Sequence, residues 1–270
     1  MHVATVSSRQ RGIAHLSAFA TKPKTRRSAL KQHSSGFIIG LVVTIILGFG
    51  VVAAVALGLR SASGLGYQPD VLQATKTGPN AATLNISTFP DSQVCHPGAP
   101  APEIDWVSYC NSTTWELPAN SVITVVIKQY DGASGLYNDF FQNVQGTVGG
   151  VAMYNNKPMN QIKADDAAHT FTIQSQPDEP SGSRIFVSVP LLGVADDAPS
   201  NTNVTGLDGN QYQYPKPNVI EFQFRTGPAG HTYIWHCYVP CGNDRESPYG
   251  FTGPMSTTGF MAGTISVTNY

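Results

Sequence analysis

The stretch that decides the fold is GHTYIWHCYVPCG, residues 230–242, close to the C-terminal end of the chain. Its aromatic and apolar side chains alternate with a period of two, which is typical of a strand with one buried face. A glycine-rich loop follows, and the chain ends in a second alternating segment, GTISVT at residues 263–268. The sequence therefore predicts two strands joined by a long loop.

The loop between these two strands carries sulfur ligands. Cys237 and Cys241 are separated by three residues, and Met255 and Met261 follow before the last strand. Soft thiolate and thioether ligands select copper over harder ions. A strand, a cysteine loop and a late methionine therefore indicate a candidate copper site.

The segment before this loop, from residue 82 onward, consists of short alternating stretches separated by Gly, Pro and Asn turn signals. There is almost no helical periodicity, so we expect an all-β sandwich. The clearest predicted strands are residues 83–87, 114–130 (interrupted by a Pro-Ala-Asn turn), 168–173, 184–189 and 218–224.

One apolar run precedes this β region. Residues 37–59 contain no charge, and as a helix they would span about 34 Å at roughly 1.5 Å per residue, enough to cross a bilayer core of about 30 Å. The alternative is a cleaved signal peptide, whose apolar region is usually only about 7–15 residues long. We therefore predict a retained transmembrane helix at 37–59, with a tail at 1–36, a linker at 60–81 and an exported domain at 82–270.

Charge is distributed unevenly along the chain. Residues 1–36 carry seven Lys and Arg and no acid, which predicts a cytoplasmic N-terminus and an extracytoplasmic C-terminal domain in a single-pass cell-membrane protein. From residue 61 onward there are 8 Lys and Arg against 17 Asp and Glu, and 8 − 17 gives −9. Such a domain suits a basic soluble partner and argues against nucleic acid, although acidity for solubility alone explains the charge equally well.

The first two cysteines flank a proline-rich loop. In an oxidising compartment Cys95 and Cys110 are expected to form a disulfide. The sequence contains no nucleophile elbow, phosphate loop or His-Glu-x-x-His zinc motif. It therefore gives no motif for catalysis within this domain.

Three ordered motifs carry a family resemblance: DAAH at 166–169, VPLLG at 189–193 and CYVPCG at 237–242. In this order they resemble the copper A domain of cytochrome c oxidase subunit II, a cupredoxin, over roughly residues 114–267. The chain is also similar to membrane-anchored cupredoxin-like proteins whose C-terminal loop ends in Gly-Pro-Met. The resemblance implies a Greek-key β-sandwich and a copper site.

The resemblance also implies ligands at matching positions. His169 would be the upstream imidazole ligand, Cys237 and Cys241 the bridging thiolates, and the Val239 carbonyl a weak oxygen ligand. The chain departs from the pattern where the family has a second histidine and a methionine, because those two positions hold Arg245 and Pro248. The thioether of Met255 or Met261 is the expected substitute for the methionine.

A second imidazole is not evident from the sequence. His231 would lie about 20 Å from Cys237 along a strand at roughly 3.3 Å per residue, and His236 would face the opposite side. No histidine follows His236. Both a dinuclear copper A-like site and a mononuclear site therefore lack one expected ligand.

The function expected from the sequence is a membrane-anchored copper-binding electron-transfer module. Its expected partners are subunit I of a haem–copper oxidase and a basic donor such as a c-type cytochrome, and the oxidase complex would be the enzyme. The alternative is a copper-free structural or interaction domain in which Cys237 and Cys241 form a disulfide.

Overall fold

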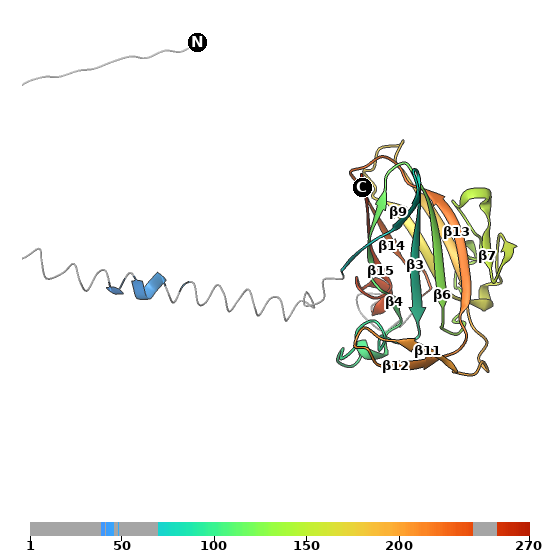
Figure 1. The fold of residues 1–270 in the computed structure, drawn as a ribbon, viewed down its shortest axis with the longest axis horizontal. Helices are drawn as coiled ribbons and strands as arrows, with labels where there is room; N and C mark the ends of the chain where they lie inside the picture. The colour runs from blue at the N-terminus through green and yellow to red at the C-terminus, as the bar shows by residue number, and fades with distance from the viewer. Residues whose placement is uncertain (1–38, 41, 46–47, 49–69, 240–252) are drawn as a thin grey trace, which may run out of the picture. The chain divides into compact units, whose positions relative to one another are not determined.

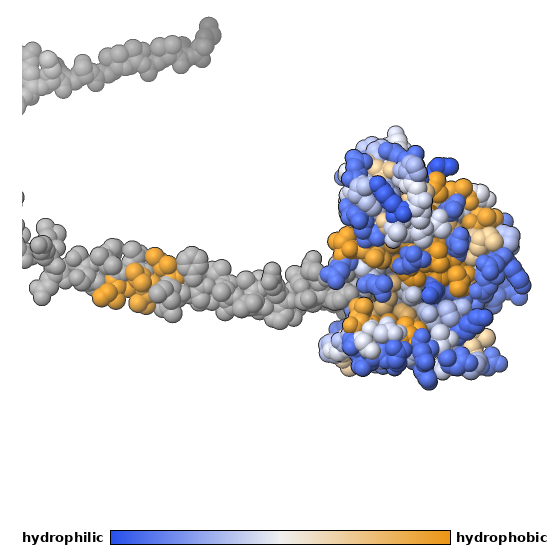
Figure 2. Space-filling model, in the orientation of Figure 1, coloured by the Kyte–Doolittle hydropathy of each residue, from blue (hydrophilic) through white to orange (hydrophobic). Residues whose placement is uncertain are grey.

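The structure is a computed structural model that describes residues 39–40, 42–45, 48, 70–239 and 253–270. All strands that it describes belong to the unit of residues 67–270 (Figure 1). All of them except the β11–β12 hairpin form two facing sheets, so the predicted all-β sandwich is confirmed. Apolar side chains in Figure 2 gather over the middle of the sandwich, between more polar regions at its two ends.

No helix among the described residues is both long and apolar enough to cross a membrane. Most of residues 37–59 and all of residues 1–36 lie outside the described ranges. The predicted membrane span and cytoplasmic tail therefore stay predictions.

The first sheet has six strands in the spatial order β1-β5-β15-β14-β9-β10. In that order their bounds are Val71–Gln73, Thr114–Pro118, Ala262–Thr268, His231–His236, Ala167–Ser175 and Phe186–Leu192. β15 is the last strand of the chain, yet it lies inside the sheet, parallel to β5 and antiparallel to β14.

The second sheet has the order β2-β3-β6-β13-β7-β8, with β4 paired to β3. Its strands, with β4 last, are Thr75–Gly78, Ala81–Phe89, Val122–Gln129, Asn218–Arg225, Ala152–Tyr154, Lys157–Met159 and Ser108–Cys110. β11 and β12 form a separate hairpin at Thr202–Thr205 and Gln211–Tyr214. Short 3-10 helices lie at Glu103–Asp105, Asp139–Gln142, Val148–Gly150, Ala164–Asp166 and Pro254–Ser256.

Period-two alternation fills the space between the sheets with apolar side chains. In β6 and β13 every second residue is buried, as expected for strands with one face on the core. Trp115 and Trp235 stack with their ring centroids 4.4 Å apart, and Phe171 stacks on both. The Trp235 indole donates to the Thr113 carbonyl at 2.9 Å, so the buried nitrogen has a partner.

The predicted boundary between the linker and the β domain is wrong. β1 and β2 lie within residues 60–81, which the sequence assigned to a linker. β1 pairs with β5 in parallel, placing Leu72 opposite Trp115, and Ala74 is buried. A few apolar residues in a stretch rich in Gly, Ser and Pro are thus enough to add a strand to a sheet edge, because the partner strand supplies the hydrogen bonds.

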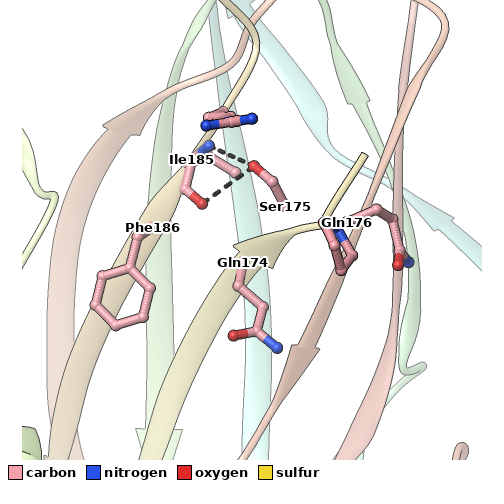
Figure 3. Close-up of a pocket in the computed structure, with 7 residues that line it drawn as sticks. Gln174, Ser175, Gln176, Ile185 and Phe186 are labelled. Carbon is pink, nitrogen blue, oxygen red and sulfur yellow. Dashed lines mark hydrogen bonds between the residues drawn. The ribbon is translucent and has the colours of Figure 1, made fainter. Parts of the chain in front are cut away.

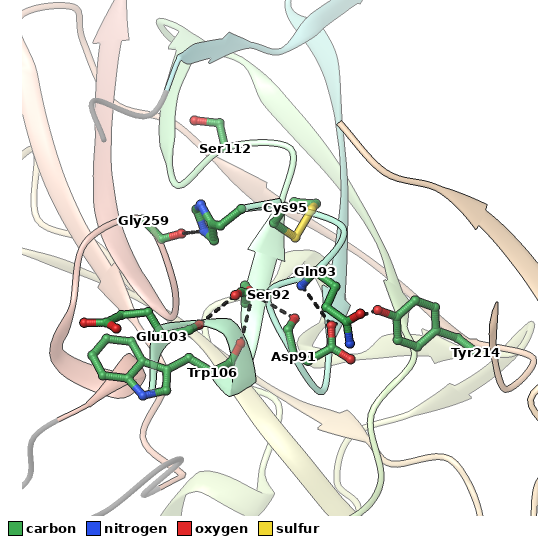
Figure 4. Close-up of a disulfide and its surroundings, with 12 residues drawn as sticks. Asp91, Ser92, Gln93, Cys95, Glu103, Trp106, Ser112, Tyr214 and Gly259 are labelled. Atoms are coloured by element: carbon green, nitrogen blue, oxygen red, sulfur yellow. Dashed lines mark hydrogen bonds between the residues drawn. A yellow bond between two sulfur atoms is a disulfide. The ribbon is translucent and has the colours of Figure 1, made fainter. Parts of the chain in front are cut away.

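The predicted disulfide between Cys95 and Cys110 is confirmed (Figure 4). It belongs to a small second core with Phe89, Tyr130 and Tyr214, under the β11–β12 hairpin. The Tyr214 hydroxyl donates to Asp91 at 2.9 Å. The disulfide therefore ties the 90–110 loop to the same cluster that holds the hairpin.

Candidate metal centre

His169 lies in β9 and is fully buried. Its Nε2 donates to Asp131 Oδ2 at 2.9 Å, and its ring also hydrogen-bonds the Cys237 side chain. Burial by itself lowers the pKa of His169, but the hydrogen bonds to Asp131 and Cys237 and the charges of both raise it, to about 9 in total. A carboxylate on one ring nitrogen orients an imidazole and leaves the other nitrogen facing the thiol, as at many metal sites.

Cys237 follows directly after β14 and is completely buried. The backbone N–H groups of Thr170 and Val239 donate to its Sγ at 3.4 and 3.3 Å. Two such donors stabilise negative charge on sulfur. The Val239 carbonyl oxygen lies 3.6 Å from the same Sγ, so this predicted oxygen ligand is beside the thiol.

The methionine loop is attached to the same point. The Cys237 N–H donates to the carbonyl of Met261 at 3.0 Å, and the Met261 N–H donates to the carbonyl of Pro254 at 3.1 Å. Met261 is fully buried in the main core, and Met255 is partly buried against it. The backbone thus brings both predicted thioethers into the core cluster that contains Cys237.

His96 anchors this loop from outside. Its Nε2 lies 2.7 Å from the Gly259 carbonyl oxygen (Figure 4), and its ring packs on Phe260 with centroids 4.5 Å apart. Burial lowers its pKa, partly offset by the hydrogen bond to Gly259. The structure thus gives His96 the role of a tether for the segment before Met261.

One sequence-predicted ligand falls outside the described residues, and the two histidines that were not expected to bind make other contacts. Cys241 lies outside the described residues, as do Arg245 and Pro248. His231 begins β14, six residues before Cys237, and its ring contacts Ser183 and Glu179. His236 is partly buried, with its Nδ1 at 3.2 Å from the Cys237 carbonyl oxygen and its ring against Tyr238 at 4.1 Å between centroids. A second imidazole ligand is therefore missing from the described part of the site.

Aromatic side chains line the outer face of the sheet over the site. Tyr238 stacks on Phe141 with centroids 4.4 Å apart, and Phe141 packs edge-on against Phe140, which is half exposed. Thr170 holds this turn, because its Oγ1 accepts the Tyr238 N–H at 2.7 Å. An unbroken row of rings thus leads from the residue after Cys237 to solvent.

The donor set fits copper better than a harder ion. One imidazole, one thiol and nearby thioethers are soft or borderline ligands, and buried thiolate–imidazole sites favour copper. Among the described residues no cluster of three His, Cys, Asp or Glu side chains is placed to hold a metal ion. Any copper here would therefore depend on sulfur from methionine or on the segment 240–252.

Two contributors to the site were not predicted from the sequence. Asp131 follows β6 and reaches His169 from the other sheet, and Thr170 bonds both to Cys237 and to the turn after it. Both contacts join residues more than 35 positions apart. The one available signal was the Tyr-Asp-Gly turn at 130–132, which places a carboxylate at the end of a buried strand.

No protein-family model and no curated protein matches this chain. Among solved structures it is similar to rusticyanin, for example the reduced protein (14% identity, 74% of this chain and 86% of that chain, TM-score 0.29). A methionine-to-leucine variant of rusticyanin matches at 12% identity, 74% and 83% coverage and TM-score 0.32. Rusticyanin from Thiobacillus ferrooxidans matches at 13%, 74% and 84%, and 0.30. Because these TM-scores lie below 0.5, we infer function from this chain's own residues.

Proposed function

We propose that the β-sandwich is a cupredoxin-like domain that binds copper and transfers electrons. The observation that carries this proposal is the buried contact between His169 and Cys237, with Asp131 on the imidazole and two backbone N–H groups on the sulfur. Copper would be held by His169 and Cys237 with a methionine thioether, and it would supply the one-electron redox chemistry. The chain orients the imidazole, stabilises the thiolate and keeps water out.

The test is copper reconstitution of the full-length chain under mild reduction. We expect bound copper with a visible thiolate-to-copper absorption band, which Cys237→Ser and His169→Ala abolish. Met261→Leu and Met255→Leu identify the thioether, because only loss of the ligand should shift the band. Met159→Leu is the matched control, since Met159 is also partly buried against the core. Unchanged copper binding in Cys237→Ser would refute the site.

The number of copper ions decides between two forms of this proposal. Two ions per chain with a mixed-valence spectrum would support a copper A-like centre that also uses Cys241. One ion would support a mononuclear centre. The first outcome favours a subunit of a haem–copper oxidase, and co-purification of a haem-containing subunit I with the membrane-embedded chain is the corresponding test.

A copper-free domain is the second candidate function. The observation that favours it is the missing second imidazole, because His231 contacts Ser183 and Glu179, and His236 contacts the Cys237 carbonyl oxygen and the Tyr238 ring. In that case Cys237 and Cys241 would form a disulfide and the sandwich would serve as an interaction subunit. A colourless purified protein without a titratable thiol, still without copper after reduction, supports this reading.

We also propose that the chain is anchored in the cell membrane through residues 37–59, with the sandwich outside. The seven Lys and Arg residues before this run support this orientation. The row of rings that ends at Phe140 offers a route between Cys237 and a basic soluble partner such as a c-type cytochrome. Protease added to intact cells should remove the sandwich and spare the tail.

A further inference from the structure

A second cluster of reactive side chains lies at the other end of β14. His231 is the first residue of that strand, six residues before Cys237, so the two sites are separated by about 20 Å at roughly 3.3 Å per residue. The loop between β9 and β10, residues 176–185, folds over His231 and contributes Glu179 and Ser183. None of these three side chains takes part in the candidate metal centre.

The contacts within this cluster run from Ser183 through the two ring nitrogens of His231 to Glu179. Ser183 Oγ lies 3.1 Å from His231 Nε2, and His231 Nδ1 forms an ion pair with Glu179 Oε1. Glu179 Oε1 is buried and has no hydrogen-bond partner in the described part of the chain apart from this contact. A buried carboxylate oxygen needs a donor, so Nδ1 carries the hydrogen. In the neutral ring Nε2 is then the acceptor for the Ser183 hydroxyl.

The loop is fixed in the shape that this arrangement needs. The N–H groups of Glu179 and Ser183 close two turns onto the carbonyls of Gln176 and Pro180, at 3.1 and 2.9 Å. The Tyr233 hydroxyl donates to the Ser183 carbonyl at 3.1 Å. At the base of the loop, Ser175 Oγ bonds both backbone groups of Ile185 (Figure 3). Ser183 is therefore held against His231 from the loop and from β14.

We propose that Ser183, His231 and Glu179 form a nucleophilic serine centre that hydrolyses small carboxylic esters. A hydroxyl on Nε2 and a carboxylate on Nδ1 are the roles by which such triads are recognised on unrelated folds. The His231 side chain is 20% exposed, so the centre is open to solvent at the end of the sandwich. Ser183 is only 9% exposed, which restricts it to small acyl groups.

The reaction uses the ester and water alone. Ser183 Oγ bonds to the carbonyl carbon while its proton passes to His231 Nε2. The ester C–O bond then breaks, and the alcohol leaves with that proton. Water, deprotonated by the same nitrogen, releases the carboxylic acid and restores Ser183. The Nε of Arg184 donates to the Glu179 carbonyl at 3.0 Å, which helps to fix the segment that carries Glu179.

The test treats the full-length chain, with a chelator present, with a fluorophosphonate probe and with 4-nitrophenyl acetate. We expect one probe per chain, located at Ser183 by peptide mass spectrometry. Ser183→Ala should abolish labelling, and His231→Gln should lower the labelling rate at least about 100-fold. Glu179→Gln keeps an oxygen toward Nδ1 but removes the charge, so its loss should be smaller.

Ser181→Ala is the matched control, because Ser181 is exposed in the same loop and should leave both rates unchanged. Thermal unfolding of each variant separates loss of the fold from loss of the nucleophile. The position of the probe in the wild-type protein tests the proposal without relying on any variant. Equal labelling of Ser181 and Ser183, or labelling of Ser183 that survives His231→Gln in folded protein, would show that the cluster only fastens the loop.

Discussion

At the scale of single residues, Gly263 shows how tightly the core is built around Trp235. A Cβ on this glycine would lie 1.8 Å from the Thr113 carbonyl oxygen and 2.7 Å from the Trp235 indole nitrogen. The hydrogen bond between those two atoms passes directly beside the glycine. Glycine is therefore required here by close approach of the backbone, since no side chain has room.

We accordingly expect Gly263→Ala to destabilise the protein by about 3 kcal/mol or more, because the backbone of Thr113 must move to admit a methyl group. Denaturant unfolding monitored by tryptophan fluorescence measures this loss. Gly182→Ala is the control: a Cβ there meets nothing within 4 Å, and the change should stay within about 0.5 kcal/mol. Similar losses for both variants would contradict the packing described here.

His96 predicts a pH dependence of stability. Its pKa in the folded protein is lower than the usual 6.5, because it is buried. As pH falls below about 6.5 the unfolded chain takes up a proton that the folded chain does not, so the free energy of unfolding decreases until the folded pKa is reached. Above 6.5 both states are neutral and this effect disappears.

The measurement compares wild type with His96→Gln, which removes the titrating group and keeps a side-chain N–H for the Gly259 carbonyl. We expect the stability advantage of the wild type to shrink between pH 7 and pH 5. Using the difference between the two proteins cancels the other titrating groups. A difference that stays constant over this range would mean that His96 does not titrate differently in the two states.

At the scale of elements, the 90–110 loop depends on its disulfide. The bond closes a loop with a sequence separation of 15 residues, for which chain entropy gives about 3 kcal/mol. Replacing Cys95 and Cys110 together by alanine should lower the free energy of unfolding by about that amount, measured by denaturant titration. The variant should still bind copper if the centre at Cys237 is independent of this loop.

Sequence patterns predicted the strands better than their contacts. Alternation of polar and apolar residues at 168–173 and 218–224 identified β9 and β13, although only β13 has one buried and one exposed face and β9 is buried on both faces. β1 was not predicted, because it is defined by its pairing with Trp115 and the neighbouring residues, and a local sequence pattern does not show such a pairing. Asp131 was missed for the same reason, because it reaches His169 only where the end of β6 lies beside β9. The Ser183–His231 contact likewise joins a loop and a strand 48 positions apart.

At the scale of the whole molecule, the acidic residues from residue 61 onward would govern how the chain meets the basic partner that we propose. Eight basic against 17 acidic residues from residue 61 onward give this part a net charge of −9. We expect electron exchange with a basic cytochrome to slow roughly tenfold when salt shortens the Debye length from about 30 Å to about 8 Å. Stopped-flow kinetics at two ionic strengths measures this. A rate that rises with salt would exclude a basic partner.

The interior position of β15 has a consequence for biosynthesis. Because β15 separates β5 from β14, the first sheet stays open until residues 262–268 have been made. Cys237 and Met261 are joined by a bond that also requires this strand to be in place. The candidate copper pocket therefore cannot form on a chain that lacks residues 262–268, and any metal would be loaded only after this strand has been made.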